Sequence, residues 1–459
     1  MRKRPYRVSL NNPWHQYLIA VIFNLFFLAV LWNSPVAYRN IQIPEGEYSD
    51  NCMAGTDVTT YVSPARHFLE HGGFLIREAE ELVPDYHRTV GYPLIISGFI
   101  ELFGEQRYLL PLYIFHCLFF ALAYPSITVI SRTLFPGRDR MPAILFILTL
   151  ITGAYWSMIP YVLSDLFFAV MLLSGFAAGV RGIVRRSWWL IAGHIILIGF
   201  AAQIRPALLL YIPVEIFLFY YLWKKQGVRP HGRDRSLFAL SVVMISFFVM
   251  LPSLRNYANY GFFGPSDIIY KNFSDFLCRD VLDNNQQYRE FKENSREYSL
   301  PGELSEWIDL QKDFSAEVIM ENPVRTAGYL FRMSARNLTA PHWHYVFKPF
   351  WITHIKSKVS HSGRAYRRTA PAVIVFNSGR VFYVLIYMII AAGMAVRLKE
   401  GVFLDETLLI LLTAALLAPT IIAGGGSRMR VPVEGFLLMY SLNYLYMFRQ
   451  RYFTEKGAV

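Results

Sequence analysis

Several charged side chains stand where apolar stretches of this sequence end. "PYVLSDLFF" carries Asp165, "AAQIRPALLLYIP" carries Arg205, and "PSLRNYANYGFFGPS" carries Arg255. "GGGSRMRVPVEGF" adds Arg428 and Arg430. An Arg guanidinium binds phosphate through a fixed fork of donors and keeps its charge in a low dielectric, while a carboxylate near a hydroxyl can act as a general base. If one site gathers them, these residue types predict binding of a phosphate-bearing ligand beside a base.

Further candidates lie near the amino terminus. "GTDVTTYVSPARHFLEHGGF" (55–74) contains Asp57 and Tyr61, and "DYHRTVGYPL" contains Arg88 and Tyr92. We expect Asp57 and Asp165 to be the acids of the site, the arginines to hold phosphate or sugar, and the two tyrosines to line the acceptor region. Simpler roles stay open, because Asp57 can cap a helix, Asp165 can form a structural ion pair, and arginines can anchor to lipid phosphates.

The elements that must position these residues are membrane helices. The chain has 459 residues, of which 54% are hydrophobic and 17% charged, too apolar for an ordinary soluble protein. Several apolar runs approach the roughly 20 residues that cross a bilayer. We therefore expect a polytopic all-α membrane protein with about ten spans: 16–33, 108–131, 141–157, 161–180, 188–204, 207–223, 236–254, 373–396, 404–422 and 433–448.

The distribution of charge predicts an orientation. Lys and Arg cluster in the segments that lie on the same side of the membrane as the amino terminus. By contrast, 24 of the 33 acidic residues fall in 34–107 and 256–371, on the opposite side of the membrane. Basic loops favour the cytoplasm, so both termini should be cytoplasmic and the candidate residues external. The net charge of +12 is then a membrane signature rather than a sign of nucleic-acid binding.

Five regions follow: 1–33, the cytoplasmic N-terminus and first span; 34–107, the first external loop; 108–255, spans two to seven; 256–371, a second large external segment with helical pieces; and 372–459, the last three spans and the C-terminus. In the first loop we expect two interfacial helices. One follows Asp57, with Pro64 as its first helical residue and Gly72 and Gly73 ending it; the other is "YPLIISGFIELF".

In order along the chain, these motifs resemble the GT-C glycosyltransferases. The match begins with Asp57, Tyr61 and Ala65, continues with "RTVGYPL" from Arg88 and "LFG" at 102–104, and then includes "LSD" at 163–165 and Arg205–Pro206. "RNYANYGFFGPS", "VIMENP" and "SRMRVPVEGFL" resemble later parts of the family. The set is most similar to the bacterial branch that contains the protein O-mannosyltransferases and the lipid A aminoarabinose transferase. The chain departs from that pattern in having Gly-Thr-Asp in place of an Asp-Glu pair and in lacking a proline before Gly91.

The resemblance implies an inverting transferase of the cell envelope that takes a sugar from a polyprenyl-phosphate donor. The expected site faces the periplasm, outside the bacterial inner membrane. Asp57 would be the catalytic carboxylate, Asp165 the second acid, and Arg88 a contact to donor phosphate or sugar. Further phosphate candidates are Arg205, Arg255, Arg428 and Arg430. The acceptor could be a glycolipid, a polysaccharide or a protein.

Two other functions stay open: a transporter or flippase of a lipid-linked sugar, and a ligase of the O-antigen type that transfers whole glycans. No cofactor is expected beyond the lipid-linked donor. His342 and His344 lack a third ligand at metal-site spacing, so no metal is assigned, although a divalent ion is not excluded. The pairing of Cys52 with Cys278 and the oligomeric state are also left open.

Overall fold

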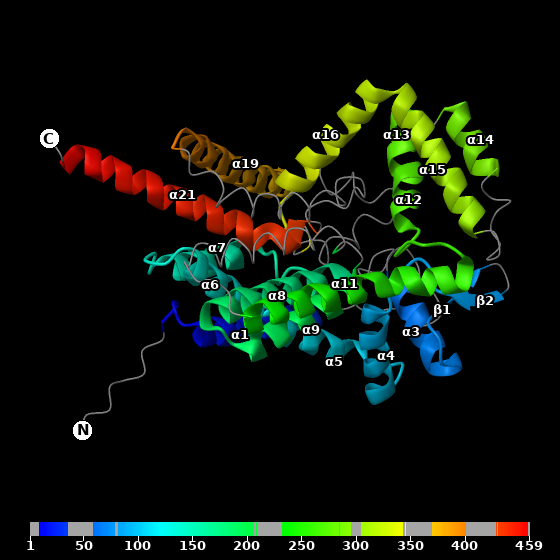
Figure 1. Ribbon diagram of the computed structural model, residues 1–459, viewed down its shortest axis with the longest axis horizontal. Helices are drawn as coiled ribbons and strands as arrows, with labels where there is room; N and C mark the ends of the chain where they lie inside the picture. Colours follow the sequence, from blue (N-terminus) through cyan, green and yellow to red (C-terminus); the bar gives the residue numbers. More distant parts are fainter. Residues whose placement is uncertain are drawn as a thin grey trace.

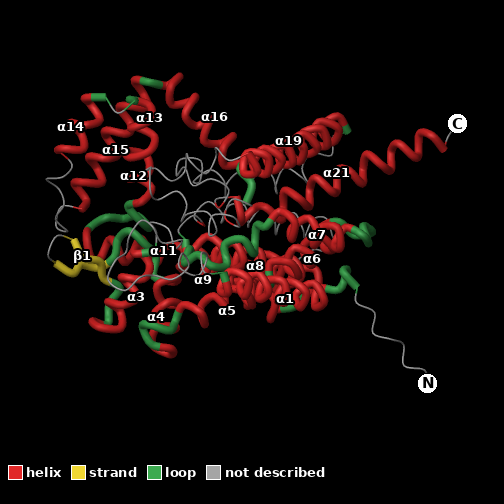
Figure 2. The backbone as a smooth tube through the Cα atoms, turned by 180° about the vertical axis from the view of Figure 1, so that it is seen from behind, coloured by secondary structure: helices red, strands yellow, loops and turns green. Residues whose placement is uncertain are grey.

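The computed structural model describes residues 9–34, 58–78, 81–205, 208, 232–283, 285–294, 304–342, 345, 370–400, 428 and 430–457. Asp57, Cys52, the predicted span 404–422 and, except for Leu208, the predicted span 207–223 lie outside these residues. Within them the chain is mainly helical, as predicted, with one short β-hairpin that the sequence analysis did not anticipate (Figures 1 and 2).

A bundle of helices forms the base of the molecule in the view of Figure 1. Its central helix, α8, is buried along most of its length, and α6, α9 and α21 (Val431–Gly457) pack against it. The bundle helices are α1 (Pro13–Asn33), α5 (Leu109–Phe120), α6 (Ala123–Leu134), α7 (Met141–Thr152), α8 (Ser164–Arg185), α9 (Trp188–Ile204) and α11 (Gly232–Tyr260).

Five helical stretches among the described residues are long and apolar enough to cross a membrane: Pro13–Asn33, Leu109–Leu134, Ser164–Arg185, Phe238–Tyr260 and Asn377–Lys399. Three shorter apolar helices accompany them, Gly91–Phe103, Met141–Thr152 and Trp188–Ile204. This supports a helical membrane protein, while the number of ten spans stays a prediction. The second predicted span consists of two helices, α5 and α6, and α11 continues to Tyr260, beyond the expected end of its span.

The described part of the segment that we predict to be the first external loop forms a compact unit beside one end of the bundle. It contains α3 (Thr59–His71), strands β1 (Leu75–Glu78) and β2 (Glu81–Pro84), and α4 (Gly91–Phe103). The strands pair antiparallel, with Leu75 opposite Pro84. Gly72 ends α3 in the left-handed region at φ 73°, as expected for a glycine C-cap. The expected start was wrong: α3 begins at Thr59, and Pro64 lies inside the helix.

The described part of the segment that we predict to be the second external one forms a helical unit on the other side of the molecule from α4 (Figure 1). It comprises α12 (Ile268–Asn272), a π-helical turn at Phe273–Cys278, α13 (Arg279–Val281), α14 (Gln286–Asn294), α15 (Leu304–Glu321) and α16 (Pro323–Thr339). Its own apolar core includes Val318 and Tyr329, and the rings of Phe291 and Phe314 stack at 3.9 Å. Helices α19 (Ala370–Lys399) and α21 (Val431–Gly457) then run side by side.

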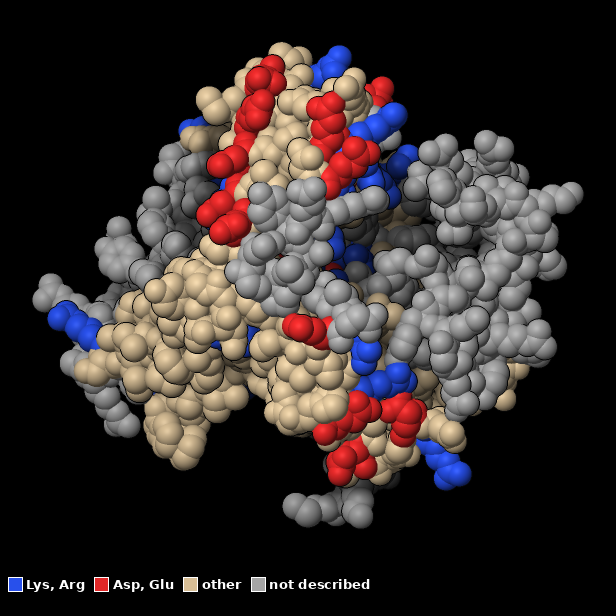
Figure 3. All heavy atoms as spheres, turned by 90° about the vertical axis from the view of Figure 1, so that its right-hand side faces the viewer, with Lys and Arg blue, Asp and Glu red and all other residues tan. Residues whose placement is uncertain are grey.

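Acidic side chains gather on the outer surface of this helical unit, and a second charged group lies over α3 and α4 (Figure 3). On α15 the exposed acids recur every three or four residues, which is the spacing of one helix face. They are Glu306, Asp309, Asp313, Glu317 and Glu321. Because α15 buries Ile308, Phe314 and Val318 on the opposite face, this acidic surface is the solvated side of an amphipathic helix.

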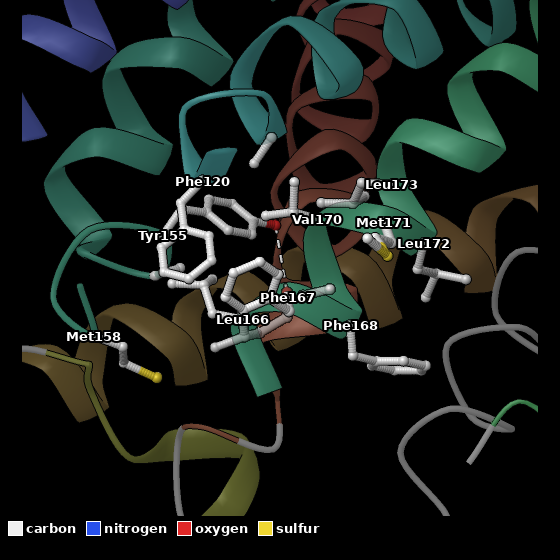
Figure 4. Close-up of a cluster of buried hydrophobic side chains, with 14 of the residues drawn as sticks. Phe120, Tyr155, Met158, Leu166, Phe167, Phe168, Val170, Met171, Leu172 and Leu173 are labelled. Carbon is white, nitrogen blue, oxygen red and sulfur yellow. Dashed lines mark hydrogen bonds between the residues drawn. The ribbon is translucent and has the colours of Figure 1, made fainter. Parts of the chain in front are cut away.

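Aromatic packing fixes the first turn of α8. Phe167 is fully buried, and its ring lies 5.1 Å from that of Phe120 and 5.2 Å from that of Tyr92 (Figure 4). Leu166 and Phe168 are buried on either side of it. Close-packed interiors resist displacement, so the residues at the amino end of α8 have a rigid support.

Gly91 marks a close approach between α4 and the end of α9. A Cβ built at Gly91 would lie 2.7 Å from the backbone oxygen of Gln203, whereas a Cβ at Gly98 meets nothing within 4 Å. We therefore expect Gly91→Ala to destabilise the protein by about 1–3 kcal/mol, because backbone must move to admit the methyl group. Gly98→Ala, on the same helix, should be neutral or stabilising. Thermal unfolding of the two purified variants in detergent checks this; equal midpoints would contradict it.

Cys117 and Cys278 are both buried free thiols. Burial raises the pKa of the Cys278 thiol to about 11, because the thiolate is poorly solvated inside the helical unit. Within the described part of the chain Cys278 is a small core residue that forms no disulfide, and its pairing with Cys52 stays untested because Cys52 lies outside that part.

Candidate functional site

Six of the predicted site residues lie where elements of the described chain begin or end. Tyr61 comes from the first turns of α3, Arg88 and Tyr92 from the turn before α4 and the start of α4, and Asp165 from the start of α8. Arg205 follows the last residue of α9, and Arg255 lies near the end of α11. The contacts among these residues show which of them form one cluster.

Asp165 and Arg205 form an ion pair. The Asp165 side chain is 4% exposed and that of Arg205 is 23% exposed, so the carboxylate is enclosed and the guanidinium reaches the surface. Asp165 lies in the first turn of α8, where the unpaired N–H groups and the helix dipole favour negative charge. Two sources of positive potential thus hold a buried carboxylate at this point.

Tyr61 joins this pair to Arg88. Its hydroxyl lies 2.7 Å from the Ser164 hydroxyl, next to Asp165 in the chain. The Arg88 guanidinium stands 4.9 Å from the centroid of the Tyr61 ring, a cation–π arrangement, and its Nε donates to Thr60 Oγ1 at 3.2 Å. Tyr92 packs edge to face against Tyr61 at 5.1 Å and is fully buried. We call Tyr61, Arg88, Tyr92, Asp165 and Arg205 the Arg88–Asp165 cluster.

Asp57 itself lies outside the described residues, so its side chain cannot be assigned to this cluster from the structure. The residues that directly follow it do belong there. Val58 is buried and precedes α3, and Thr60 and Tyr61 both contact Arg88.

Arg255 has a different environment from Arg88. Its Nη2 donates to the carbonyl of Arg88 at 3.2 Å and to Asn256 Oδ1 at 2.9 Å. Its guanidinium therefore supports the backbone of the turn that carries Arg88. Arg428 is half-buried and stands two residues before Arg430.

Arg430 is buried in a cluster of its own. Its Nε donates to Glu434 Oε2 at 2.7 Å, its Nη1 to the carbonyls of Asn337 and Leu338, and its Nη2 to the carbonyl of Ala340. These carbonyls end α16, where helical oxygens lack partners of their own. Arg430 is 0% exposed, so every nitrogen of its guanidinium caps α16 or pairs with Glu434.

Tyr383 and His342 complete this buried cluster. The Arg430 guanidinium lies 3.6 Å from the centre of the Tyr383 ring, and the Tyr383 hydroxyl donates to Glu434 Oε1 at 2.5 Å. His342 Nε2 is 3.6 Å from Glu434 Oε2. His344 lies outside the described residues, and among those described no group of three or more His, Cys, Asp or Glu side chains could hold a metal.

The turn before α4 contains functional candidates that the sequence analysis did not single out. Asp85 is buried, and its Oδ1 accepts the N–H groups of His87 at 2.8 Å and Arg88 at 3.0 Å. Burial raises the pKa of the Asp85 carboxyl, although His87, the Arg88 N–H and Arg255 oppose that rise. His87 contacts Asp267, which is 180 residues away in the sequence. The only sequence signal for this hydrogen-bond network was that Asp85 and His87 stand close to Arg88.

Comparison with known proteins supports the fold. No protein-family model matches the chain, and no curated protein matches its sequence. Among solved structures, the chain is similar to an archaeal oligosaccharyltransferase, AglB from Archaeoglobus fulgidus, solved in complex with an inhibitory peptide and a dolichol-phosphate. The TM-score is 0.51 at 14% identity, over 97% of this chain and 52% of AglB.

This chain thus has a helical fold similar to that of AglB and spans about half the length of AglB. At 14% identity the likeness extends to the fold alone. It supports the GT-C part of the sequence resemblance and leaves the bacterial branch a prediction.

Proposed function

We propose that this protein is an integral membrane glycosyltransferase of the cell envelope. It transfers a sugar from a polyprenyl-phosphate donor to a glycolipid, polysaccharide or protein acceptor. The reaction takes place at the outer face of the bacterial cytoplasmic membrane, with both termini of the chain in the cytoplasm, and inverts the anomeric centre.

One observation carries the proposal. An arginine over a tyrosine ring and a buried carboxylate–arginine pair converge from α3, the turn before α4, α8 and α9 at one end of an apolar helix bundle. A lipid-linked phosphate needs an apolar surface for its isoprenoid and guanidiniums for its head group. The fold adds support, because AglB was solved with a dolichol-phosphate, which is also a lipid-linked phosphate.

The proposed reaction is a single displacement. The acceptor hydroxyl oxygen attacks the anomeric carbon while the bond from that carbon to the phosphate oxygen breaks, and polyprenyl phosphate leaves. Asp57 takes the proton of the hydroxyl as the general base. Arg88 and Arg205 hold the phosphate in the bound donor and throughout its departure, and the Asp165 carboxylate stabilises positive charge on the sugar.

The remaining arginines receive supporting roles in this proposal. Arg255 holds the Arg88 backbone, and Arg430 holds the end of α16, since their donors are directed at protein oxygens. Arg428 is a phosphate contact in the proposal. Tyr61 and Tyr92 shape the wall of the site, with Tyr61 as the ring that Arg88 covers.

Transfer of a whole glycan is the second candidate function. The likeness to an oligosaccharyltransferase favours it specifically. Such an enzyme would need room beside the Arg88–Asp165 cluster for several sugar residues and would use a lipid-linked oligosaccharide as its donor.

Defined donors separate the two candidates. The purified protein in detergent is incubated with a polyprenyl-phosphate monosaccharide, or with a lipid-linked oligosaccharide, in the presence of lipid A, polysaccharide or peptide acceptors. Mass spectrometry of the acceptors reads the result. Gain of one sugar supports the first proposal, gain of a glycan supports the second, and no gain with any donor contradicts both.

Arg88→Gln is expected to raise the KM for the donor about 10- to 100-fold, since charge-assisted hydrogen bonds contribute roughly 1.5–3 kcal/mol. Gln keeps a polar group that can still meet Thr60 but removes the charge. The exposed Arg107, beyond the end of α4, supplies a matched control, and Arg107→Gln should leave donor KM unchanged. Initial rates over a donor series measure both, and equal KM values for the two variants would remove Arg88 from the site.

A further inference from the structure

Residues at the start of the second external segment form hydrogen bonds with the turn that carries Arg88. We call residues 255–267 the clamp segment and residues 84–88 the Arg88 turn. Four carbonyls of the turn accept hydrogen bonds from the clamp segment. Pro84 accepts from the Tyr260 hydroxyl, Tyr86 from the Asp267 N–H, His87 from the Ser266 hydroxyl at 2.6 Å, and Arg88 from Arg255 Nη2 at 3.2 Å.

The side chains of His87 and Asp267 close this contact. His87 Nδ1 lies 2.8 Å from Asp267 Oδ1, and because a carboxylate only accepts, Nδ1 carries the proton. The Asp267 side chain is 0% exposed, and its Oδ2 has no hydrogen-bond partner in the described part of the chain. A buried carboxylate is costly without a partner, so the His87 hydrogen bond matters for keeping Asp267 in place.

The clamp segment also connects the turn to the helical unit. Asp267 directly precedes α12. Beneath the turn, Val83 and Tyr86 share one apolar cluster with Phe262 of the clamp segment and with Leu304 and Ile308 of α15. The rings of Tyr86 and Tyr260 meet edge to face at 5.4 Å. Movement of α12 or α15 would therefore be transmitted to the backbone of the Arg88 turn.

We propose that Asp267, through His87, is a positioning residue that fixes Arg88 for the donor phosphate and couples the helical unit to that end of the site. This rests on the proposed function only in giving Arg88 a phosphate to hold. The described residues of the Arg88 turn include no helix or long strand that would fix its conformation. Instead, the Asp85 carboxylate accepts two N–H groups of the turn, and the clamp segment donates to the carbonyls of the turn. When the clamp is released, Arg88 loses its orientation while keeping its charge.

The test uses four variants of the full-length protein. Asp267→Ala and His87→Ala break the pair, while His87→Asn retains a side-chain N–H near the position of Nδ1. Asp280→Asn is the matched control. It weakens the salt bridge of Asp280 to Arg332 within the same helical unit, away from the Arg88 turn. Because charge-assisted hydrogen bonds to a phosphate depend on geometry, we expect Asp267→Ala and His87→Ala to raise donor KM at least about ten-fold.

The pattern of kinetic constants separates positioning from general damage. Arg88 holds the phosphate before and during transfer, so kcat and acceptor KM should change little in the two alanine variants. His87→Asn should restore donor KM to near the wild-type value, and Asp280→Asn should not alter it. Wild-type donor KM in both alanine variants, or failure of His87→Asn to rescue, would overturn the proposal.

Hydrogen exchange provides a readout that does not depend on activity. Amides of residues 85–90 should exchange faster in Asp267→Ala and His87→Ala than in the wild type, and at the wild-type rate in His87→Asn. If the wild-type protein uses no lipid-phosphate donor, the proposed function fails while this exchange pattern still supports the clamp. Unchanged exchange in the alanine variants overturns the clamp whatever the enzyme's activity.

Discussion

Asp57→Asn is expected to lower kcat about 10²- to 10⁴-fold, the range that a positioned general base contributes. Asparagine has nearly the same shape as aspartate but cannot accept the proton that the acceptor hydroxyl releases. Donor KM should stay within a few-fold of wild type, because phosphate binding rests on Arg88 and Arg205 in the proposed site. Steady-state rates with saturating donor and acceptor measure the change.

A matched substitution controls for the loss of one acidic charge. Asp139 is exposed in the connection between α6 and α7, and Asp139→Asn should leave both kcat and KM unchanged. Asp165→Asn makes an informative comparison, since it weakens the pair with Arg205 without removing the proposed base. If Asp57→Asn turned over at the wild-type rate while Asp165→Asn was inactive, Asp165 would take the role of base.

The position of the Arg88–Asp165 cluster could be anticipated from span ends. Asp165 and Arg205 each stand where an apolar run stops, and the structure begins α8 at Ser164 and ends α9 at Ile204. Two helices joined by a short connection at one end bring their other ends close together, so an acid and an arginine at those ends can meet. Hydropathy alone therefore predicted the neighbourhood of this pair, though not the contact itself.

The start of α3 shows why local signals gave a wrong boundary. Ser63–Pro64 has the composition of a helix start, because proline fits the first turn without losing a hydrogen bond. The helix nevertheless begins at Thr59, since Tyr61, Val62 and Ala65 are buried against the rest of the protein. Burial of this apolar face outweighs the one backbone bond that Pro64 removes.

Contacts over long sequence separations could not be predicted. His87 and Asp267 are 180 residues apart, and Arg430 and Asn337 are 93 apart. An arginine in a Gly- and Arg-rich turn gives the same sequence signal whether it binds a lipid phosphate or caps a distant helix. Only the placement of the end of α16 next to the residue that precedes α21 directs the Arg430 guanidinium at carbonyls of the protein.

That placement predicts a large loss of stability for Arg430→Met. The substitution leaves Glu434 as a buried carboxylate without its main partner and leaves the last carbonyls of α16 without donors. Removing one member of a buried ion pair typically costs about 3–5 kcal/mol. Denaturant titration of the purified protein, followed by circular dichroism, should show this loss. The half-buried pair of Arg397, in the last turn of α19, and Glu400, just beyond that helix, is the control, and Arg397→Met should cost less than about 1 kcal/mol.

A double substitution separates the two tasks of Arg430. In Arg430→Met with Glu434→Gln the buried charge is gone, so the part of the loss due to an unpaired carboxylate should be recovered. The part due to uncapped α16 carbonyls should remain, because methionine has no donor. If Arg430 instead held the donor phosphate, Arg430→Met would raise donor KM and leave the unfolding curve at its wild-type position. A loss of stability would thus assign Arg430 a structural role, and a raised donor KM would assign it to phosphate binding. The buried hydrogen bonds to Asn337 and Ala340 favour the structural role.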